Sequence, residues 1–391
     1  MSEFRTIREL CSVVVDCPHS TPKWTTSGKI VVRNNNIKHG RIDLSSPSYT
    51  DEEHFAQRIK RAKPQPGDII ITREAPIGDV GMIPENTECC LGQRMVLLRA
   101  DQSVCDNFYL LYSLQSLYVQ HQISWSEGTG TTVSNLRIPH LEQIQIPYLP
   151  IGQQMKISSV LRSLEEKIEN NRKLNDNLLD QMQALYKSWF VDFLPFDGVR
   201  PESWTKTDIY SLANIIYGAP FASKQFNTAG EGKPIIRIRD LKDQQFATYT
   251  TEVHPKGYLL QPGDIVVGMD GEFRPYIWGN DEAWLNQRVC VFENKRPNGK
   301  AFLYFTIKPL LYSIEQTQVA TTVIHIGKKD YDAFAITLPD TTTLDNFDAL
   351  TSPMIMQIVS NSFENKRLSS MRDALLLKLM SGEIDISSIQ L

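Results

Sequence analysis

The 391-residue sequence lacks the patterns that mark several common classes of protein. It has no Gly-x-x-x-x-Gly-Lys-Ser/Thr, no Gly-x-Ser-x-Gly and no Asn/Asp-Pro-Pro-aromatic motif, which argues against a P-loop motor, a nucleophile-elbow hydrolase and an adenine methyltransferase. No run reaches the roughly 18 apolar residues of a membrane-spanning helix, and the first residues do not read as a signal peptide. We therefore expect a cytoplasmic protein without membrane contact that is not itself an enzyme.

Disulfide and metal-binding patterns are also missing. The six cysteines are scattered without a Cys-x-x-Cys pair, and five of them lie in the first half of the chain, so we expect reduced thiols. The seven histidines are equally dispersed, which argues against a zinc site. The net charge of −4 argues mildly against nucleic-acid binding, although basic charge can be local or supplied by a partner subunit.

What the sequence does contain is an internal repeat. The landmarks that recur are a Pro-Gly-Asp step, an x-Gln-Arg step, a Thr-Thr-Val step and a Glu-Asn segment in a helical stretch. Their first residues are Pro66 and Pro262, Gly92 and Asn286, Thr131 and Thr321, and Glu169 and Glu364, at offsets of 196, 194, 190 and 195 residues. Near-constant offsets indicate a duplicated unit of about 195 residues that ends in a helix. This plan predicts a pseudo-two-fold molecule suited to a long, two-part ligand such as duplex DNA.

Each copy combines strand signals with one long helix. Apolar runs with β-branched residues, as at Lys29–Ile37 and Lys233–Leu241, predict strands, and further strands follow the Pro-Gly turns. Each copy also has a shorter helix, and Pro309 is expected to kink or split the second one. We predict an α+β fold in which two α/β domains are separated by two long helices packed as an antiparallel coiled coil. The predicted boundaries are 1–150 and 196–345 for the globular domains and 151–195 and 346–391 for the helices.

The first long helix has apolar residues at a three-four spacing, interrupted by Asn171 and Asn175. Asparagine in such a seam costs stability but fixes register and partner. Two arrangements fit this seam: an intramolecular coiled coil with the second helix, and an intermolecular zipper that forms a homodimer. The residues predicted for the seam are Ile157, Leu161, Leu164, Ile168, Asn171, Leu178, Met182, Leu185, Leu368, Met371, Leu375 and Leu379.

The segment Pro147–Leu178, PYLPIGQQMKISSVLRSLEEKIENNRKLNDNL, resembles the junction between a target-recognition domain and the conserved helix of type I restriction-modification specificity subunits. The family pattern is a strand, Leu-Pro, Glu-Gln or a close relative, and a helix with Leu-x-x-Leu-Glu-x-Lys-Ile. Gln153-Gln154 stands in the Glu-Gln position here. The segments PGDIIITREAPIG and GTGTTVSNL are also similar to the family, and the resemblance covers both copies. The second copy is more diverged and lacks the Gln-Gln pair.

This resemblance implies a non-catalytic subunit that binds double-stranded DNA. Each recognition domain would read one half of a split site, and the coiled coil would set the half-site spacing and dock two adenine-N6 methyltransferase subunits. Motor-nuclease subunits can then join. S-adenosylmethionine would bind to the methyltransferase subunits, so no cofactor is expected on this chain. The alternative from another class is a non-catalytic two-domain protein-interaction scaffold held by a coiled coil.

The repeated landmarks and the basic residues beside them supply groups suited to DNA. Arginine pairs with guanine, asparagine and glutamine pair with adenine, and lysine, serine and threonine hold phosphates. The predicted DNA-binding residues are Arg33, Lys38, Arg73, Gln93, Arg94, Thr131, Thr132, Arg237, Arg239, Lys242, Arg274, Gln287, Arg288, Thr321 and Thr322. The Gln-Arg pairs can alternatively be sheet-edge residues, and the first Thr-Thr pair can contact a phosphate or simply form a turn. Because the flanking residues differ between the copies, we expect an asymmetric bipartite target.

Overall fold

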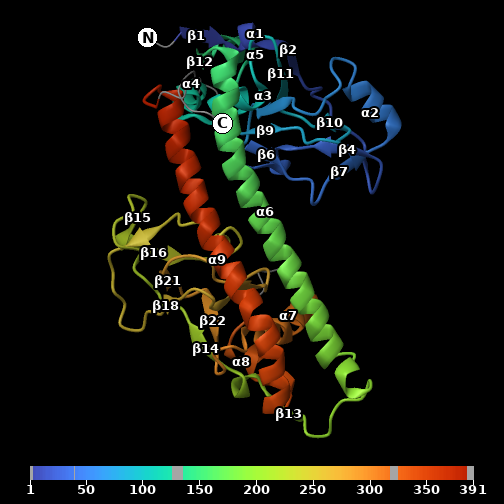
Figure 1. The fold of residues 1–391 in the computed structure, drawn as a ribbon, viewed down its shortest axis with the longest axis vertical. Coiled ribbons are helices and arrows are strands. Elements are labelled where there is room, and N and C mark those ends of the chain that lie inside the picture. The colour runs from blue at the N-terminus through green and yellow to red at the C-terminus, as the bar shows by residue number, and fades with distance from the viewer. Residues whose placement is uncertain (1–2, 39, 126–134, 318–324, 385–391) are drawn as a thin grey trace. The chain divides into compact units, whose positions relative to one another are not determined.

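The computed structural model describes residues 3–38, 40–125, 135–317 and 325–384. The chain forms two compact units, of which the first comprises Met1–Glu166 and Ser369–Leu391 and the second comprises Lys167–Leu368. Each unit therefore holds one globular copy together with segments of two long helices, α6 (Ile151–Phe190) and α9 (Thr341–Met380). Figure 1 shows α6 in green and α9 in red.

Three sheets make up the globular part of the first unit. Its strands are β1 (Glu3–Thr6), β2 (Cys11–Asp16), β3 (Trp24–Thr25), β4 (Lys29–Val32), β5 (Ile37–Lys38), β6 (Gly40–Ile42), β7 (Ser48–Thr50), β8 (Ile69–Thr72), β9 (Val80–Met82), β10 (Cys89–Leu91), β11 (Met95–Ala100) and β12 (Gln145–Tyr148). The largest sheet has the order β2-β11-β8-β9-β6-β5, and the second has the order β10-β4-β7-β3. The pairing of β1 with β12 brings the two ends of the globular copy together.

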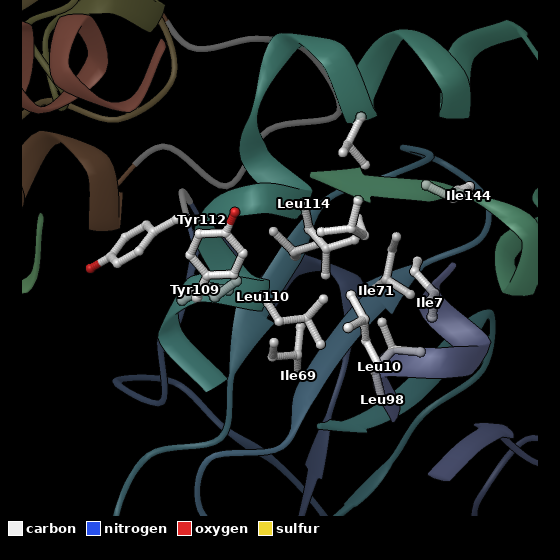
Figure 2. Packing of buried hydrophobic residues seen from close by; sticks show 14 of the residues in the cluster. Ile7, Leu10, Ile69, Ile71, Leu98, Tyr109, Leu110, Tyr112, Leu114 and Ile144 are labelled. Carbon is white, nitrogen blue, oxygen red and sulfur yellow. The ribbon is translucent and has the colours of Figure 1, made fainter. Parts of the chain in front are cut away.

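The core of the first unit lies against both faces of the largest sheet. Ile69 and Ile71 of β8 belong to one buried cluster, whereas Ile70 between them belongs to another, as the alternation of side chains along a strand requires. Figure 2 shows the first cluster, in which Ile69 and Ile71 lie near Leu110 and Leu114 of α3. The helices of this globular part are α1 (Ile7–Leu10), η1 (Asn34–Asn36), α2 (Glu52–Arg58), α3 (Asn107–Gln115), α4 (Leu117–Trp125) and α5 (Ile138–Gln143).

The second unit repeats this plan. The counterpart of the six-stranded sheet has four strands here, and the counterpart of the four-stranded sheet has five. Its strands are β13 (Thr205–Asp208), β14 (Ala213–Tyr217), β15 (Phe226–Asn227), β16 (Lys233–Ile236), β17 (Tyr249–Thr250), β18 (Leu259–Leu260), β19 (Ile265–Gly268), β20 (Pro275–Ile277), β21 (Ala283–Leu285), β22 (Val289–Asn294) and β23 (Ala335–Leu338). Its shorter helices are η3 (Leu194–Phe196), η4 (Ile209–Ser211), η5 (Ser223–Gln225), η6 (Ile238–Asp240), α7 (Lys300–Thr317) and α8 (Lys328–Asp332). The strand orders are β14-β22-β19-β20 and β15-β17-β16-β21-β18, and β13 pairs with β23.

The two copies share a common set of strand pairings, to which the first adds β6 and β5 and the second adds β18. In the first, β10 runs parallel to β4 with Cys90 opposite Val31, and in the second, β21 runs parallel to β16 with Trp284 opposite Ile235. In both copies the strand after the Pro-Gly-Asp step pairs antiparallel with the strand after the x-Gln-Arg step. The predicted α+β class is therefore confirmed. Of the two effects expected of Pro309, a kink or a split, the split does not occur, because α7 continues through Pro309 as a single helix.

The Pro-Gly-Asp step is a turn held by the same bonds in both copies. Gly67 and Gly263 both have a φ of 84°, a left-handed conformation that glycine adopts without a Cβ clash. The aspartate carboxylate that follows accepts a hydrogen bond from the backbone N–H three residues earlier, at 2.8 Å in both copies. This repeated motif therefore fixes where β8 and β19 begin.

The second glutamine of the predicted pair connects α6 to the first globular copy. Gln154 is fully buried, and its Oε1 accepts a hydrogen bond from the Asp106 backbone N–H at 2.9 Å. Its Nε2 donates to the carbonyl oxygens of Val104 and Leu149 at 3.0 and 2.8 Å. One side-chain amide thus satisfies three backbone groups, which fixes the start of α6 against the segment between β11 and α3.

The second copy, which lacks the glutamine pair, holds its long helix through charged groups. α9 begins at Thr341 rather than at 346, because the Asp340 carboxylate caps the first turn by accepting the Thr343 backbone N–H at 2.9 Å. This hydrogen bond lowers the pKa of Asp340. Further along, the Arg296 guanidinium donates to the buried Asp348 carboxylate at 2.9 Å. Arg296 lies between β22 and α7, so the same junction is fixed by an ion pair instead of an amide.

In the second unit α6 and α9 run antiparallel and are joined by polar side chains. Asn171 donates to Glu364 Oε2 at 2.7 Å and to Asn365 Oδ1 at 3.0 Å, and Asn361 donates to Asn175 Oδ1 at 2.7 Å. Rising residue numbers on α6 thus meet falling numbers on α9 of the same chain. These contacts form the intramolecular arrangement rather than the intermolecular zipper.

The residues predicted for the seam divide between the two units. Buried ones are Ile157, Leu161 and Leu379 in the first unit and Ile168, Asn171 and Met182 in the second, and half-buried ones are Leu164, Leu375, Leu178, Leu185 and Leu368. Met371 differs, since 47% of it is exposed. The physical reason is that its neighbour Arg372 approaches the buried Glu165 carboxylate at 3.5 Å and takes the inward position on α9.

All six cysteines are free and buried. Burial raises the pKa of Cys11, Cys89 and Cys290 to about 12, so these side chains are thiols at neutral pH. In the described ranges, His, Cys, Asp and Glu side chains form no group of three or more that could hold a metal ion. No helix within those ranges is long and apolar enough to cross a bilayer.

We expect Gln154→Ala to lower the free energy of unfolding of the first unit by about 1–3 kcal/mol, because buried backbone groups lose their partner. Urea unfolding followed by circular dichroism measures this change. Gln153→Ala removes the adjacent, half-buried glutamine and serves as the control, with an expected change within about 0.5 kcal/mol. Equal losses for the two variants would contradict the role of Gln154.

Candidate nucleic-acid interface

Three landmarks of the repeat meet at the end of one strand in each unit. In the first unit the Arg73 N–H donates to the Arg94 carbonyl at 2.8 Å, and the Leu136 N–H donates to the Arg73 carbonyl at 3.0 Å. The equivalent residues of the second unit, with both bonds at 2.9 Å, are Met269, Arg288 and Ile326. The segment after the Pro-Gly-Asp strand, the Gln-Arg step and the residues after the Thr-Thr-Val step are therefore held together by backbone bonds.

In the first unit the arginine of the Gln-Arg step belongs to a small polar cluster of Arg94, Glu74 and Asn135, which we call the carboxylate cluster. Arg94 is 54% exposed, and its Nε lies 3.2 Å from Glu74 Oε2. Asn135 donates to the other oxygen of the same carboxylate at 2.7 Å. The carboxylate thus holds an exposed arginine beside the strand end and neutralises its charge.

The carboxylate cluster of the second unit has the same plan with different side chains. Arg288 is 53% exposed and lies 3.6 Å from Asp270 Oδ1, and His325 Nδ1 lies 2.6 Å from the same oxygen. Glu74 is thus replaced by Asp270 and Asn135 by His325. The arrangement of one exposed arginine, one carboxylate and one further polar group is repeated, while the chemistry at each place is changed.

Arg73 has a different environment from Arg94. Its guanidinium donates to Asp16 Oδ2 at 2.9 Å, to the Leu136 carbonyl at 2.9 Å and to Asn135 Oδ1 at 3.1 Å. Only 11% of its side chain is exposed. Arg73 therefore ties β2 and the segment after residue 134 to the end of β8, and its guanidinium is engaged inside the unit.

The two glutamines of the Gln-Arg steps also differ. Gln93 is half-buried, and its amide nitrogen donates to the His19 carbonyl and to Thr21 Oγ1, which holds the loop that precedes β3. Gln287 is exposed. Gln93 thus makes hydrogen bonds within the unit, as the sheet-edge interpretation expects, whereas a DNA contact of either glutamine stays a prediction.

An open hollow of about 620 Å³ lies beside the first carboxylate cluster. Its lining includes Trp24, Arg33, Asn35, Gln93 and Arg94. Arg33 is exposed, and its guanidinium lies over the Trp24 ring at 5.1 Å from the centroid. The hollow therefore combines an aromatic face with arginine and amide groups, which are the side chains that read nucleobases.

The basic residues that follow β16 occupy a different setting. Arg237 is held by Asp240, with Nε and Oδ2 3.6 Å apart, and it donates a hydrogen bond to Thr248 Oγ1. Arg239 is 67% exposed and lies 3.8 Å from the same Asp240 carboxylate, and Lys242 is exposed. Of these three, Arg239 and Lys242 present their charge to solvent.

The remaining predicted residues lie elsewhere or outside the described part of the chain. Arg274 pairs with Glu315 of α7 and lies over the Tyr312 ring at 5.6 Å. The Glu315 hydrogen bond raises the pKa of Arg274. The residues Thr131, Thr132, Thr321 and Thr322 and the side chain of Lys38 lie outside the described residues.

Several residues of this site were not anticipated from the sequence. Glu74 and Asp270 carry the same 196-residue offset as the Pro-Gly-Asp step, so the repeat itself could have drawn attention to them. Trp24 lies in a segment without a recurring landmark, and its exposure next to Arg33 depends on the pairing of β3 with β7. Sequence reasoning had no signal for that contact.

Comparison with known proteins places this architecture in a family. Residues 2–179 and 201–355 match the family described as type I restriction modification DNA specificity domain. Because the match covers most of the chain and both copies, the chain belongs to the type I restriction-modification specificity family. Members of this family are DNA-recognition subunits and are not catalytic by themselves.

Individual relatives show how far the similarity extends. The chain is 37% identical over 139 residues to the specificity subunit of the type I restriction enzyme EcoBI of Escherichia coli, which covers 35% of this chain and 29% of that protein. It is 25% identical over 350 residues to the MjaIX specificity subunit of Methanocaldococcus jannaschii, covering 83% of this chain and 79% of that one. The solved S subunit from M. genitalium is 18% identical, with a TM-score of 0.54 and coverage of 96% and 95%, and shares the fold.

We expect Arg73→Ala to destabilise the first unit by about 3 kcal/mol, because the largely buried Asp16 carboxylate would lose its guanidinium partner and keep only the contact with His19 Nε2 at 3.0 Å. Chemical denaturation of the purified chain measures the change. Arg94→Ala removes an exposed member of an ion pair in the same segment and should cost no more than about 1 kcal/mol. A larger loss for Arg94→Ala than for Arg73→Ala would reject this division of roles.

Proposed function

We propose that this chain is the DNA sequence-recognition subunit of a type I restriction-modification complex, and that each globular copy reads one half of an asymmetric bipartite site. The observation that carries the proposal is the pair of carboxylate clusters, in which identical backbone bonds hold different side chains. A conserved frame supports a common way of approaching duplex DNA. Different side chains on that frame support different base sequences in the two halves. The proposed recognition domains are residues 1–150 and 196–345.

Electrostatics supports a DNA contact at the clusters despite the net charge of −4. Arg94 and Arg288 are exposed by about half and are paired with one carboxylate each. Exposed pairs of this kind contribute roughly 0–1 kcal/mol, so a DNA phosphate can replace the carboxylate at little cost. Arg239, Lys242 and Gln287 add exposed donors in the second copy. The remaining basic surface would come from the partner subunits.

We also propose that α6 and α9 set the distance between half-sites and dock two methyltransferase subunits. The polar contacts of Asn171 and Asn361 support a fixed register between the helices, since a shifted register would leave buried amides unpaired. Large apolar side chains that are exposed on the two helices support a partner surface there. They are Met155, Leu174, Leu350, Met356, Met371 and Leu377. S-adenosylmethionine would be held by the partners, and motor-nuclease subunits would complete a restriction enzyme.

The test is reconstitution with the cognate methyltransferase subunit. Adenine-N6 methylation of a mixed duplex library should depend on this chain and should fall at one bipartite motif with unlike halves. Binding measured by fluorescence anisotropy should weaken as salt rises, because phosphate contacts release counterions. A two-domain protein scaffold would give neither result, and methylation without a motif would reject DNA recognition by this chain.

Neutralising the carboxylates beside Arg94 and Arg288 should strengthen DNA binding that does not depend on base sequence. We expect Glu74→Gln to raise the affinity of the complex for random duplexes and to steepen the salt dependence by about 0.9 in log–log slope, one phosphate contact. Asp270→Asn should act in the same direction in the second copy. Glu53→Gln removes an equal charge from α2 and is the control. If it matches Glu74→Gln, net charge alone explains the gain.

The helices can be tested as a spacer. A four-residue insertion after Asn175 in α6, matched by one after Ser360 in α9, adds about 6 Å at roughly 1.5 Å per residue. The methylated motif should then have a spacer longer by one or two base pairs, at about 3.4 Å per base pair, with unchanged half-sites. The same insertion after Gly198, in the exposed segment that follows α6, should leave the spacer unchanged. Altered half-sites with the original spacer would contradict this role.

A further inference from the structure

Arg33 of the first unit has surroundings that differ from those of Arg73 and Arg94. Arg73 and Arg94 are paired with carboxylates at 2.9 and 3.2 Å. For Arg33 the described residues provide the Trp24 ring, at 5.1 Å, and Ser48 Oγ, which accepts a hydrogen bond at 3.4 Å. Among these residues no carboxylate lies within ion-pair distance of Arg33, so its guanidinium keeps most of its donors for a ligand.

Arg33 and Trp24 come from two strands of the four-stranded sheet that both pair with β7: Arg33 follows the end of β4, and Trp24 begins β3. The Arg33 N–H donates to Asn36 Oδ1 at 2.9 Å, which closes the turn after β4. Trp24 lies opposite Thr50 of β7, and Lys29 of β4 lies opposite the same Thr50. The ring is thus carried by β3, and the guanidinium reaches it from the turn that follows β4, with β7 between the two strands. The 45% exposure of Trp24 leaves the ring at the surface.

The second copy has the same backbone arrangement and a different side-chain arrangement. Phe226 lies opposite Thr250 as Trp24 lies opposite Thr50, and the Arg237 N–H is bonded to Asp240 at 3.0 Å as that of Arg33 is bonded to Asn36. Phe226, however, packs against a buried cluster of Ala219, Phe221 and Ile235. Arg237 is taken up by Asp240 and Thr248. Arg237, the counterpart of Arg33, therefore makes its contacts within the second unit.

An exposed arginine guanidinium that lacks a carboxylate partner is suited to bind guanine. Arginine offers parallel N–H donors that match the O6 and N7 acceptors on the major-groove edge of guanine. A ring beneath the guanidinium limits its rotation, so less freedom is lost when both hydrogen bonds form. The hollow of about 620 Å³ beside Arg33 leaves room for the edge of a base pair, and Asn35 and Gln93 line it as well.

We propose that Arg33 reads a guanine in the half-site recognised by the first unit, and that Trp24 is a positioning residue that orients its guanidinium. This inference rests on the proposed DNA-recognition function. It also assigns an asymmetry, because the counterpart Arg237 does not read a base.

The experiment uses the chain in complex with its cognate methyltransferase subunits and a duplex library with randomised positions. Sequencing of methylated products gives the base preference at every position for wild type, Arg33→Ala, Arg33→Lys, Trp24→Ala and Trp24→Phe. Arg33→Lys keeps the charge but not the planar fork of donors, so a phosphate contact should survive it unchanged while a guanine contact should be weakened. Trp24→Phe keeps an aromatic face and is the matched control for Trp24→Ala. Thermal unfolding confirms that each variant is folded.

We expect Arg33→Ala to reduce the preference for guanine at one position by roughly 5- to 150-fold, with the other positions unchanged. Arg33→Lys should reduce it less, because an ammonium can still donate to guanine O6 or N7. Trp24→Ala should weaken the same preference and Trp24→Phe should retain it. In a duplex with 7-deazaguanine at that position, wild type should lose affinity and Arg33→Ala should not. Retention of the guanine preference by Arg33→Ala, or an equal loss for all duplexes in that variant, would overturn the proposal. A wild-type complex without any base preference would instead overturn the proposed function.

Discussion

The structure of each copy depends on a small set of backbone hydrogen bonds at the end of one strand. In the first unit they join Arg73 to Arg94 and Leu136, and the second unit repeats them with distances within 0.1 Å. Since N–H and carbonyl groups make these bonds, the side chains at the same positions are free to vary. This explains how Asn135 and His325 can occupy one place in the frame. It also explains why the copies keep a common set of strand pairings although their sequences have diverged.

In the two long helices, buried apolar side chains stabilise the packing and buried polar side chains fix the register. Ile157, Leu161, Ile168 and Met182 are the apolar residues of the predicted seam that are buried along α6. Asn171 is equally buried, and its amide has partners on α9. A coiled coil of apolar residues alone can slide by one turn at modest cost, whereas a buried amide that loses its partners costs about 1–3 kcal/mol. The asparagines therefore exchange some stability for a single register.

Much of the fold could be predicted because the sequence repeats its turns. The Pro-Gly-Asp step has one conformation in both copies, and the heptad spacing of α6 locates its buried face. The candidate site was predictable only in part. Arg94 and Arg288 were found through the repeat, but the engagement of Arg73 by Asp16 depends on strand pairing between distant residues, which spacing does not encode. The inward turn of Arg372 in place of Met371 likewise reflects a contact with Glu165, not a local preference.

The burial of every cysteine has a practical consequence for spectroscopy. Cys11, Cys17, Cys89, Cys90, Cys105 and Cys290 are each at most 7% exposed, and burial raises the pKa of all six thiols. Thiol-reactive dyes react with the thiolate of accessible cysteines, so we expect the folded chain to be labelled very slowly. A single cysteine placed on an exposed residue of either unit would carry the dye alone. Pairs of such labels, one on each unit, would report by energy transfer how the distance between the recognition domains responds when DNA binds.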